Sequence, residues 1–86
     1  MTRDEHLEWA KQRALEYVDR ARKAHSLAQV REELADAYAS IGSDLSKHQE
    51  LKNHRGIEFG MMLIMMPNST YLSNPDDMER FIKGFN

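Results

Sequence analysis

Residues 3–47 read RDEHLEWAKQRALEYVDRARKAHSLAQVREELADAYASIGSDLSK, and this stretch decides the fold. In its first half, apolar side chains recur at steps of three and four, the period of one helix face. They are Leu7, Ala10, Ala14, Val18 and Ala21. Acidic residues open this half and basic residues close it, as the helix dipole favours. The pattern predicts an amphipathic helix over residues 3–23, with Thr2 and Glu5 forming a capping box.

The second half begins with Ser26-Leu27-Ala28-Gln29, the S-x-x-Q form that caps a helix start. Apolar side chains then follow at helical spacing, namely Leu27, Val30, Leu34, Tyr38, Ile41 and Leu45. We therefore expect a second helix over residues 27–47, in which Gly42 indicates a bend or a close contact with another helix. A break at His25 and Ser26 folds the two helices into a long antiparallel hairpin. One continuous helix is the alternative that the residues also allow.

Two shorter helices are expected after a polar loop. Residues 54–66 are apolar at almost every position from Ile57 onward, and a helix that is apolar all round is typically buried on several sides. Pro67 is predicted to end this helix. Asn74-Pro75-Asp76-Asp77 is typical of a helix start, which predicts a last helix over residues 75–83. Gly84 is expected to end it in the left-handed conformation.

Length and composition restrict the fold and the compartment. The 86 residues are 41% hydrophobic and 30% charged, carry a net charge of −2 and include no cysteine. These values predict one all-α domain of four helices over residues 1–86, without disulfides or thiolate zinc. The longest apolar run is too short for a membrane span, and the polar first residues do not resemble a signal peptide. We therefore expect a cytoplasmic protein.

The sequence offers few residues for chemistry. The glycines do not cluster into a phosphate loop, and no catalytic or cofactor-binding set is recognisable, so no enzyme and no cofactor are expected. His54 and Glu58 lie four residues apart on one helix face, which leaves metal binding as an alternative function. His6 and His25, and the carboxylates of the second helix, Asp44 among them, are interpreted as solvated.

A second alternative is a small nucleic-acid-associated regulatory protein. Basic side chains gather near the end of the first helix and could contact phosphates, while Trp9 or Tyr17 could stack on a base. The basic residues are Arg20, Arg22, Lys23 and Arg31. A net charge of −2 argues against this function, because nucleic-acid-binding domains are usually basic.

A cluster of methionines is the strongest indication of function in the sequence. Met61, Met62, Met65 and Met66 fall within six residues, and methionine is common on adaptable binding surfaces. These residues either fill the core or serve both the core and an interface. In the second case they form a partner-binding face, and a homodimer is the simplest way to cover it.

Several strings in this sequence resemble a family of short uncharacterised proteins from tailed phages and prophages of actinobacteria. They occupy residues 5–19, 35–48, 53–63 and 80–86. The resemblance implies a phage origin and expression in the cytoplasm of the bacterial host, and it implies no enzymatic activity. Together these points predict a non-catalytic accessory protein that acts through protein–protein interaction, either on a host or defence factor or as an assembly aid.

Overall fold

The computed structural model describes residues 2–66 and 69–85, and in these ranges the protein consists of helices and turns without a strand. The four helices are α1 (Arg3–Arg22), α2 (Leu27–Ser46), α3 (Arg55–Met65) and α4 (Pro75–Lys83). The predicted all-α fold is confirmed, and each boundary lies within one residue of its expected position. Pro67, the expected stop of the third helix, lies outside the described residues.

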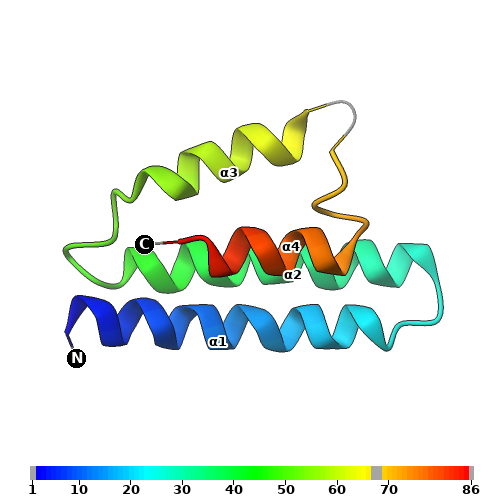
Figure 1. The fold of residues 1–86 in the computed structure, drawn as a ribbon, viewed down its shortest axis with the longest axis horizontal. Coiled ribbons are helices and arrows are strands. Elements are labelled where there is room, and N and C mark those ends of the chain that lie inside the picture. Colours follow the sequence, from blue (N-terminus) through cyan, green and yellow to red (C-terminus); the bar gives the residue numbers. More distant parts are fainter. Residues whose placement is uncertain (1, 67–68, 86) are drawn as a thin grey trace.

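α1 and α2 form the long antiparallel hairpin that the sequence predicted, with the break at residues 23–26 (Figure 1). Each helix begins at its expected cap. The Thr2 hydroxyl accepts a hydrogen bond from the Glu5 backbone N–H, and the Glu5 carboxylate accepts one from the Thr2 N–H, so the capping box is complete. The Ser26 hydroxyl accepts from the Gln29 N–H at 3.2 Å. These caps fix where the chain turns.

The core lies where α1, α2 and α4 meet. Its buried apolar residues are Leu7, Ala10, Ala14, Val18, Ala21, Leu34, Ala37, Ile41, Leu45, Leu51, Met78, Ile82 and Phe85. The whole predicted stripe of α1 is therefore buried, and its alanines allow the neighbouring helices to approach closely. Leu27 was expected on the buried face of α2 but is 55% exposed, because it is the first residue of the helix and lies beyond the reach of the core.

α4 packs against both helices of the hairpin. It begins as expected, with the Asn74 side chain accepting from the Asp76 N–H at 2.9 Å and Pro75 in the first turn. Its end differs from the prediction, because Gly84 has a right-handed φ of −77°. The Gly84 N–H instead continues the helical pattern, donating to the carbonyls of Arg80 and Phe81 at 3.0 and 3.2 Å. A left-handed residue is therefore not needed here.

α3 lies along the opposite side of α4 from α1, as the uppermost helix in Figure 1. Turns over residues 47–54 lead into it, and buried Leu51 anchors them to the core. Within the described part of the chain, we find no helix with both the length and the apolar character that crossing a bilayer requires.

Candidate functional site

Two glycines one turn apart, Gly56 and Gly60, dock α3 onto the body of the protein. A Cβ atom at Gly60 would overlap Phe81 Cζ and lie 2.9 Å from Phe81 Cε1 and 3.1 Å from Tyr38 Cε2. A Cβ atom at Gly56 would lie 2.6 Å from Phe85 Cε1. Carbon atoms in contact are normally about 3.5–4.0 Å apart. α3 therefore packs this closely only because both positions lack a side chain.

The surface beneath these glycines is an aromatic shelf made of Tyr38, Tyr71, Phe81 and Phe85. Phe81 lies at its centre, with ring centroids 5.1 Å from Phe85, 5.8 Å from Tyr71 and 6.1 Å from Tyr38. The Phe85 and Tyr71 rings meet that of Phe81 edge to face, which is a favoured aromatic geometry. The ring–ring contacts restrict the movement of each ring, so α3 packs on a rigid surface.

Polar contacts hold α3 in register on the shelf. The Tyr38 hydroxyl donates to the Ile57 carbonyl at 2.8 Å, and desolvation raises the pKa of Tyr38, which keeps the hydroxyl in its donating form. At the start of α3, His54 Nδ1 accepts from the Gly56 N–H at 2.9 Å, and the His54 ring lies 5.2 Å from that of Phe85. The orientation of α3 is thus fixed from its first turn.

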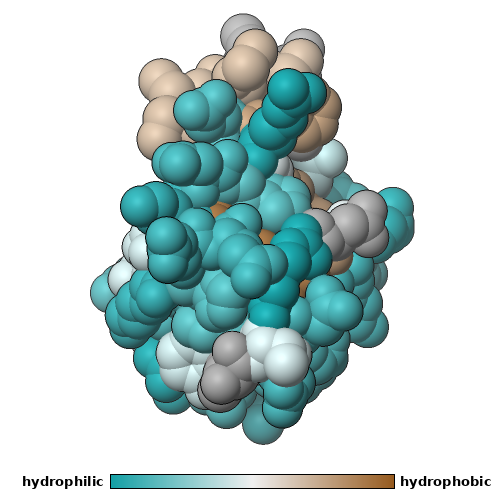
Figure 2. Space-filling view, turned by 90° about the vertical axis from the view of Figure 1, so that its left-hand side faces the viewer, coloured by the Kyte–Doolittle hydropathy of each residue, from teal (hydrophilic) through white to brown (hydrophobic). Residues whose placement is uncertain are grey.

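Large apolar side chains cover the side of α3 that faces away from the shelf. We call this set the outer face: Phe59, Met61, Met62 and Met65 of α3, and Met66, which follows its last residue. Each of the five is between 54% and 76% exposed. Figure 2 shows apolar residues gathered at the top of the molecule, where α3 lies, above a mostly hydrophilic body. The outer face is the candidate functional site.

The exposure of α3 corrects two expectations. The helix was predicted to be buried on several sides, and its methionines to fill the core wholly or in part. The described side chains of its inner face, Ile57 and Ile64, do pack against the core, but the four clustered methionines do not. The reason is α4, whose own apolar stripe fills the groove of the hairpin. Only its aromatic flank is left for α3.

Asp44 was expected in solvent but is buried on α2 in an ion cluster. Its carboxylate accepts from Arg13 Nε at 2.8 Å, from Lys47 Nζ at 3.2 Å and from the Ser40 hydroxyl at 3.4 Å. Desolvation by itself would raise the pKa of Asp44, but the bonds to Arg13 and Lys47 outweigh it and lower the pKa. The carboxylate is therefore held ionised, which suits a structural ion pair.

His6 was also expected in solvent and is buried. Its Nε2 atom lies 2.5 Å from the Asp44 carbonyl oxygen, and its ring packs between Trp9 and His48, with centroids 5.0 and 5.1 Å away. The Trp9 ring in turn has the Arg13 guanidinium 5.0 Å from its centroid. Trp9 therefore stacks on neighbours within the protein.

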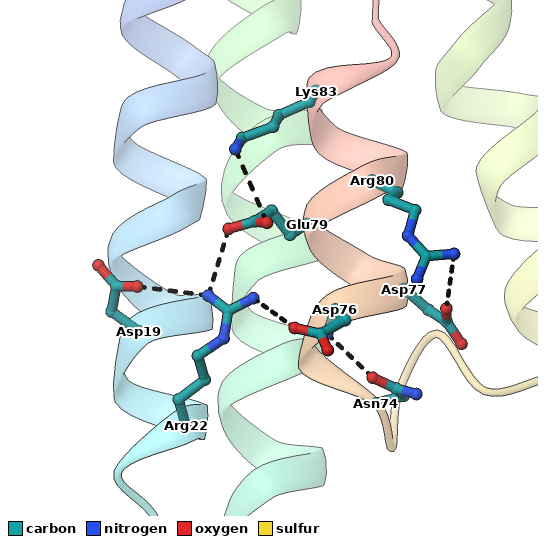
Figure 3. A network of polar contacts seen from close by, with 8 residues as sticks. All are labelled: Asp19, Arg22, Asn74, Asp76, Asp77, Glu79, Arg80 and Lys83. Atoms are coloured by element: carbon teal, nitrogen blue, oxygen red, sulfur yellow. Dashed lines mark hydrogen bonds and ion pairs between the residues drawn. The ribbon is translucent and has the colours of Figure 1, made fainter.

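Two of the basic side chains that could contact nucleic acid, those of Arg20 and Arg22, already have partners within the protein. Arg22 forms ion pairs with Asp19 on α1 and with Asp76 and Glu79 on α4, at 3.5, 2.9 and 3.3 Å (Figure 3). The Arg20 guanidinium lies 4.9 Å from the centre of the Tyr17 ring. Arg22 thus joins the end of α1 to the start of α4, where the carboxylates also complement the helix dipole.

The positions of the candidate ligands give little support to metal binding at His54 and Glu58. His54 uses Nδ1 to cap α3, as described above, so a metal ion at that nitrogen would displace the cap. Among the residues that the structure describes, no group of three histidine, cysteine, aspartate or glutamate side chains is placed to hold a metal ion. A stable site normally needs at least three protein ligands.

Sequence reasoning overlooked the docking glycines and Phe59, although signals for both were present. Gly56 and Gly60 are spaced by one helical turn in a mostly apolar helix, which is typical of close packing. Phe59 follows Gly56 by three residues, and its ring is exposed at the edge of the face that the glycines occupy. In comparisons with known proteins, no family model, no curated protein and no solved structure matches this chain. Function is therefore inferred from its own side chains.

Proposed function

We propose that this protein is a non-catalytic, phage-type accessory protein that works in the host cytoplasm by binding another protein through the outer face of α3. One observation carries the proposal: five large apolar side chains are exposed on a helix already docked by its other face. Methionine is flexible and polarisable, so a methionine-rich surface adapts to its partner. A modulator of a host or defence factor and an assembly aid would both need such a surface.

The size of the outer face supports binding. Five side chains that are each more than half exposed present about 500 Å² of apolar surface, as large as the largest patch on typical monomers. At ~25 cal/mol per Å², covering it recovers about 12 kcal/mol before any cost of association. Association itself costs about 4–15 kcal/mol. The difference is at most about 8 kcal/mol, so we expect reversible binding with a dissociation constant in the micromolar range or weaker, not a permanent complex.

The non-catalytic part of the proposal draws support from the buried ion cluster. A general acid or base works best with a pKa near the working pH, which for a carboxyl group means a raised pKa. Asp44 has a lowered pKa, and both of its carboxylate oxygens are bonded to basic side chains. Such a carboxylate stabilises the hairpin and is poorly suited to proton transfer.

The test is capture of partners from phage-infected cells with three tagged forms of the protein. Met62→Glu places a charge in the outer face, while Leu27→Glu places the same charge on another exposed apolar residue, on α2. We expect at least one protein to bind the native chain and the Leu27→Glu control and to be lost with Met62→Glu. Identical sets of proteins from all three forms would contradict the proposal.

A further inference from the structure

The geometry points to a second copy of this chain as the occupant of the outer face. We infer that α3 pairs with α3 of another copy in antiparallel orientation, with Met62 of both copies near the two-fold axis. The inference rests on the proposed function, because it assigns a second copy to the same surface, from which weak pairing would release it to another protein. Three observations carry it: the spacing of the apolar residues, the charges at the helix start and the area available.

The spacing on α3 is that of a helix–helix seam. Phe59 and Met62 lie one turn apart on α3, and Met66, just past the end of the helix, continues the i, i+3 and i+7 spacing that packs one helix against another. All three are more than half exposed. A seam of this kind is best covered by a second helix of similar length with apolar residues at matching steps. α3 of a second copy satisfies both conditions.

The antiparallel orientation follows from residue types along this seam. Phe59 and Met66 lie on either side of Met62, so an antiparallel pair places each Phe59 level with Met66 of the second copy. Sulfur–aromatic contacts are favourable, and the helix dipoles also oppose each other in this arrangement. A parallel pair would bring the Arg55 side chains of the two copies next to each other, and likewise the two Glu58 side chains. Antiparallel pairing keeps these like charges apart.

The available area fits a weak dimer. Two outer faces bury about 1,000 Å² in total, which is at the lower limit for a specific interface. Interfaces of this size are typical of transient complexes. A net charge of −2 per chain adds little repulsion between copies. The pairing we infer therefore has a dissociation constant in the micromolar range and is partly dissociated in dilute solution.

Sedimentation equilibrium from about 1 to 500 µM tests this pairing, because the range spans both sides of a micromolar dissociation constant. We expect a monomer–dimer equilibrium for the native chain and for the Leu27→Glu control. Met62→Glu should weaken the dimer at least tenfold while far-UV circular dichroism stays native. A native chain that remains monomeric throughout the range overturns the inference, as does a dimer that Met62→Glu leaves intact.

Single-cysteine variants test the orientation, since the native chain contains no cysteine. Under mild oxidation, Met62→Cys should form a disulfide-linked dimer much faster than the control Leu27→Cys. When equal amounts of Phe59→Cys and Met66→Cys chains of different mass are mixed, the mixed disulfide should clearly exceed one half of all disulfides, the share that random pairing gives. A mixed share of one half or less overturns the antiparallel arrangement, because parallel helices place identical residues opposite each other.

Failure of the pairing is distinguishable from failure of the proposed function. If the native chain is monomeric but Met62→Glu still removes a captured protein, the second-copy inference is wrong and the binding face stands. If Met62→Glu unfolds the monomer, Met62 belongs to the core in solution. In that case both proposals are wrong.

Discussion

A pair of glycine-to-alanine substitutions tests the seating of α3 on its aromatic shelf. Gly60→Ala adds a methyl group where the Cβ atom would overlap Phe81 Cζ and approach Tyr38 Cε2 to 3.1 Å. Gly42→Ala adds the same group in the interior of α2, where nothing lies within 4 Å of the Cβ position. Gly42 thus makes no close helix contact, contrary to one reading of the sequence. The two variants share their chemistry and differ in surroundings.

The expected magnitudes follow from two terms. Alanine is favoured over glycine inside a helix by about 1 kcal/mol, and Gly42→Ala should gain that amount in full. Gly60→Ala gains the same term but overpacks the shelf, which typically costs about 1–3 kcal/mol. The Phe81 ring cannot move freely, because Tyr38, Tyr71 and Phe85 surround it. We expect a net loss of about 1 kcal/mol and a difference of about 2 kcal/mol between the variants.

Urea unfolding followed by far-UV circular dichroism measures this difference. For a domain of this size, about 2 kcal/mol corresponds to about 8–16 °C in melting temperature, so thermal melts give an independent check. The slope of the free energy of unfolding against urea concentration should be unchanged in Gly42→Ala. Equal stabilisation by both substitutions would refute the reasoning, because it would mean that α3 does not rest on the shelf through Gly60.

Three further outcomes are expected. Tyr38→Phe removes the hydrogen bond to the Ile57 carbonyl and should lower the free energy of unfolding by about 0.5–1.5 kcal/mol in urea titrations. Arg22→Met breaks the link between α1 and α4 and should cost less than about 1 kcal/mol, with the loss shrinking at high salt; a loss that ignores salt would contradict a role in ion pairing. Because the folded pKa of Asp44 is lowered, its contribution to stability is present at neutral pH and is lost as the pH falls below about 4 through that pKa. Asp44→Asn should therefore destabilise the protein at pH 7 by about 1–2 kcal/mol, and paired urea titrations should show this difference shrinking as the pH falls below about 4.

The helices and most of the core could be predicted because their signals are local. Caps such as Thr2, Ser26 and Asn74 state where a helix begins, and the stripe on α1 shows which face is buried. Gly84 was misjudged because a helix can also end by tightening its last hydrogen bonds, and glycine permits either ending.

The burial of individual polar and apolar side chains depends on contacts between distant elements. Asp44 lies on the same stripe as Ile41, but its burial depends on Arg13, which is 31 residues away in the sequence. The exposure of α3 depends on competition with α4 for one hairpin groove. No local pattern reveals which of the two helices packs into that groove. The methionines were identified as a candidate binding face from the sequence, whereas their exposure to solvent could be found only in the structure.

Oxidation of the methionines by dilute hydrogen peroxide, mapped by peptide mass spectrometry, tests the outer face most directly. Exposed thioethers oxidise faster than buried ones, and fully buried Met78 is an internal reference in the same chain. We expect Met62 and Met65 to oxidise well before Met78 in dilute protein, and more slowly as the protein concentration rises. Oxidation of Met62 and Met65 at the slow rate of Met78, even in dilute solution, would contradict an exposed binding face on α3.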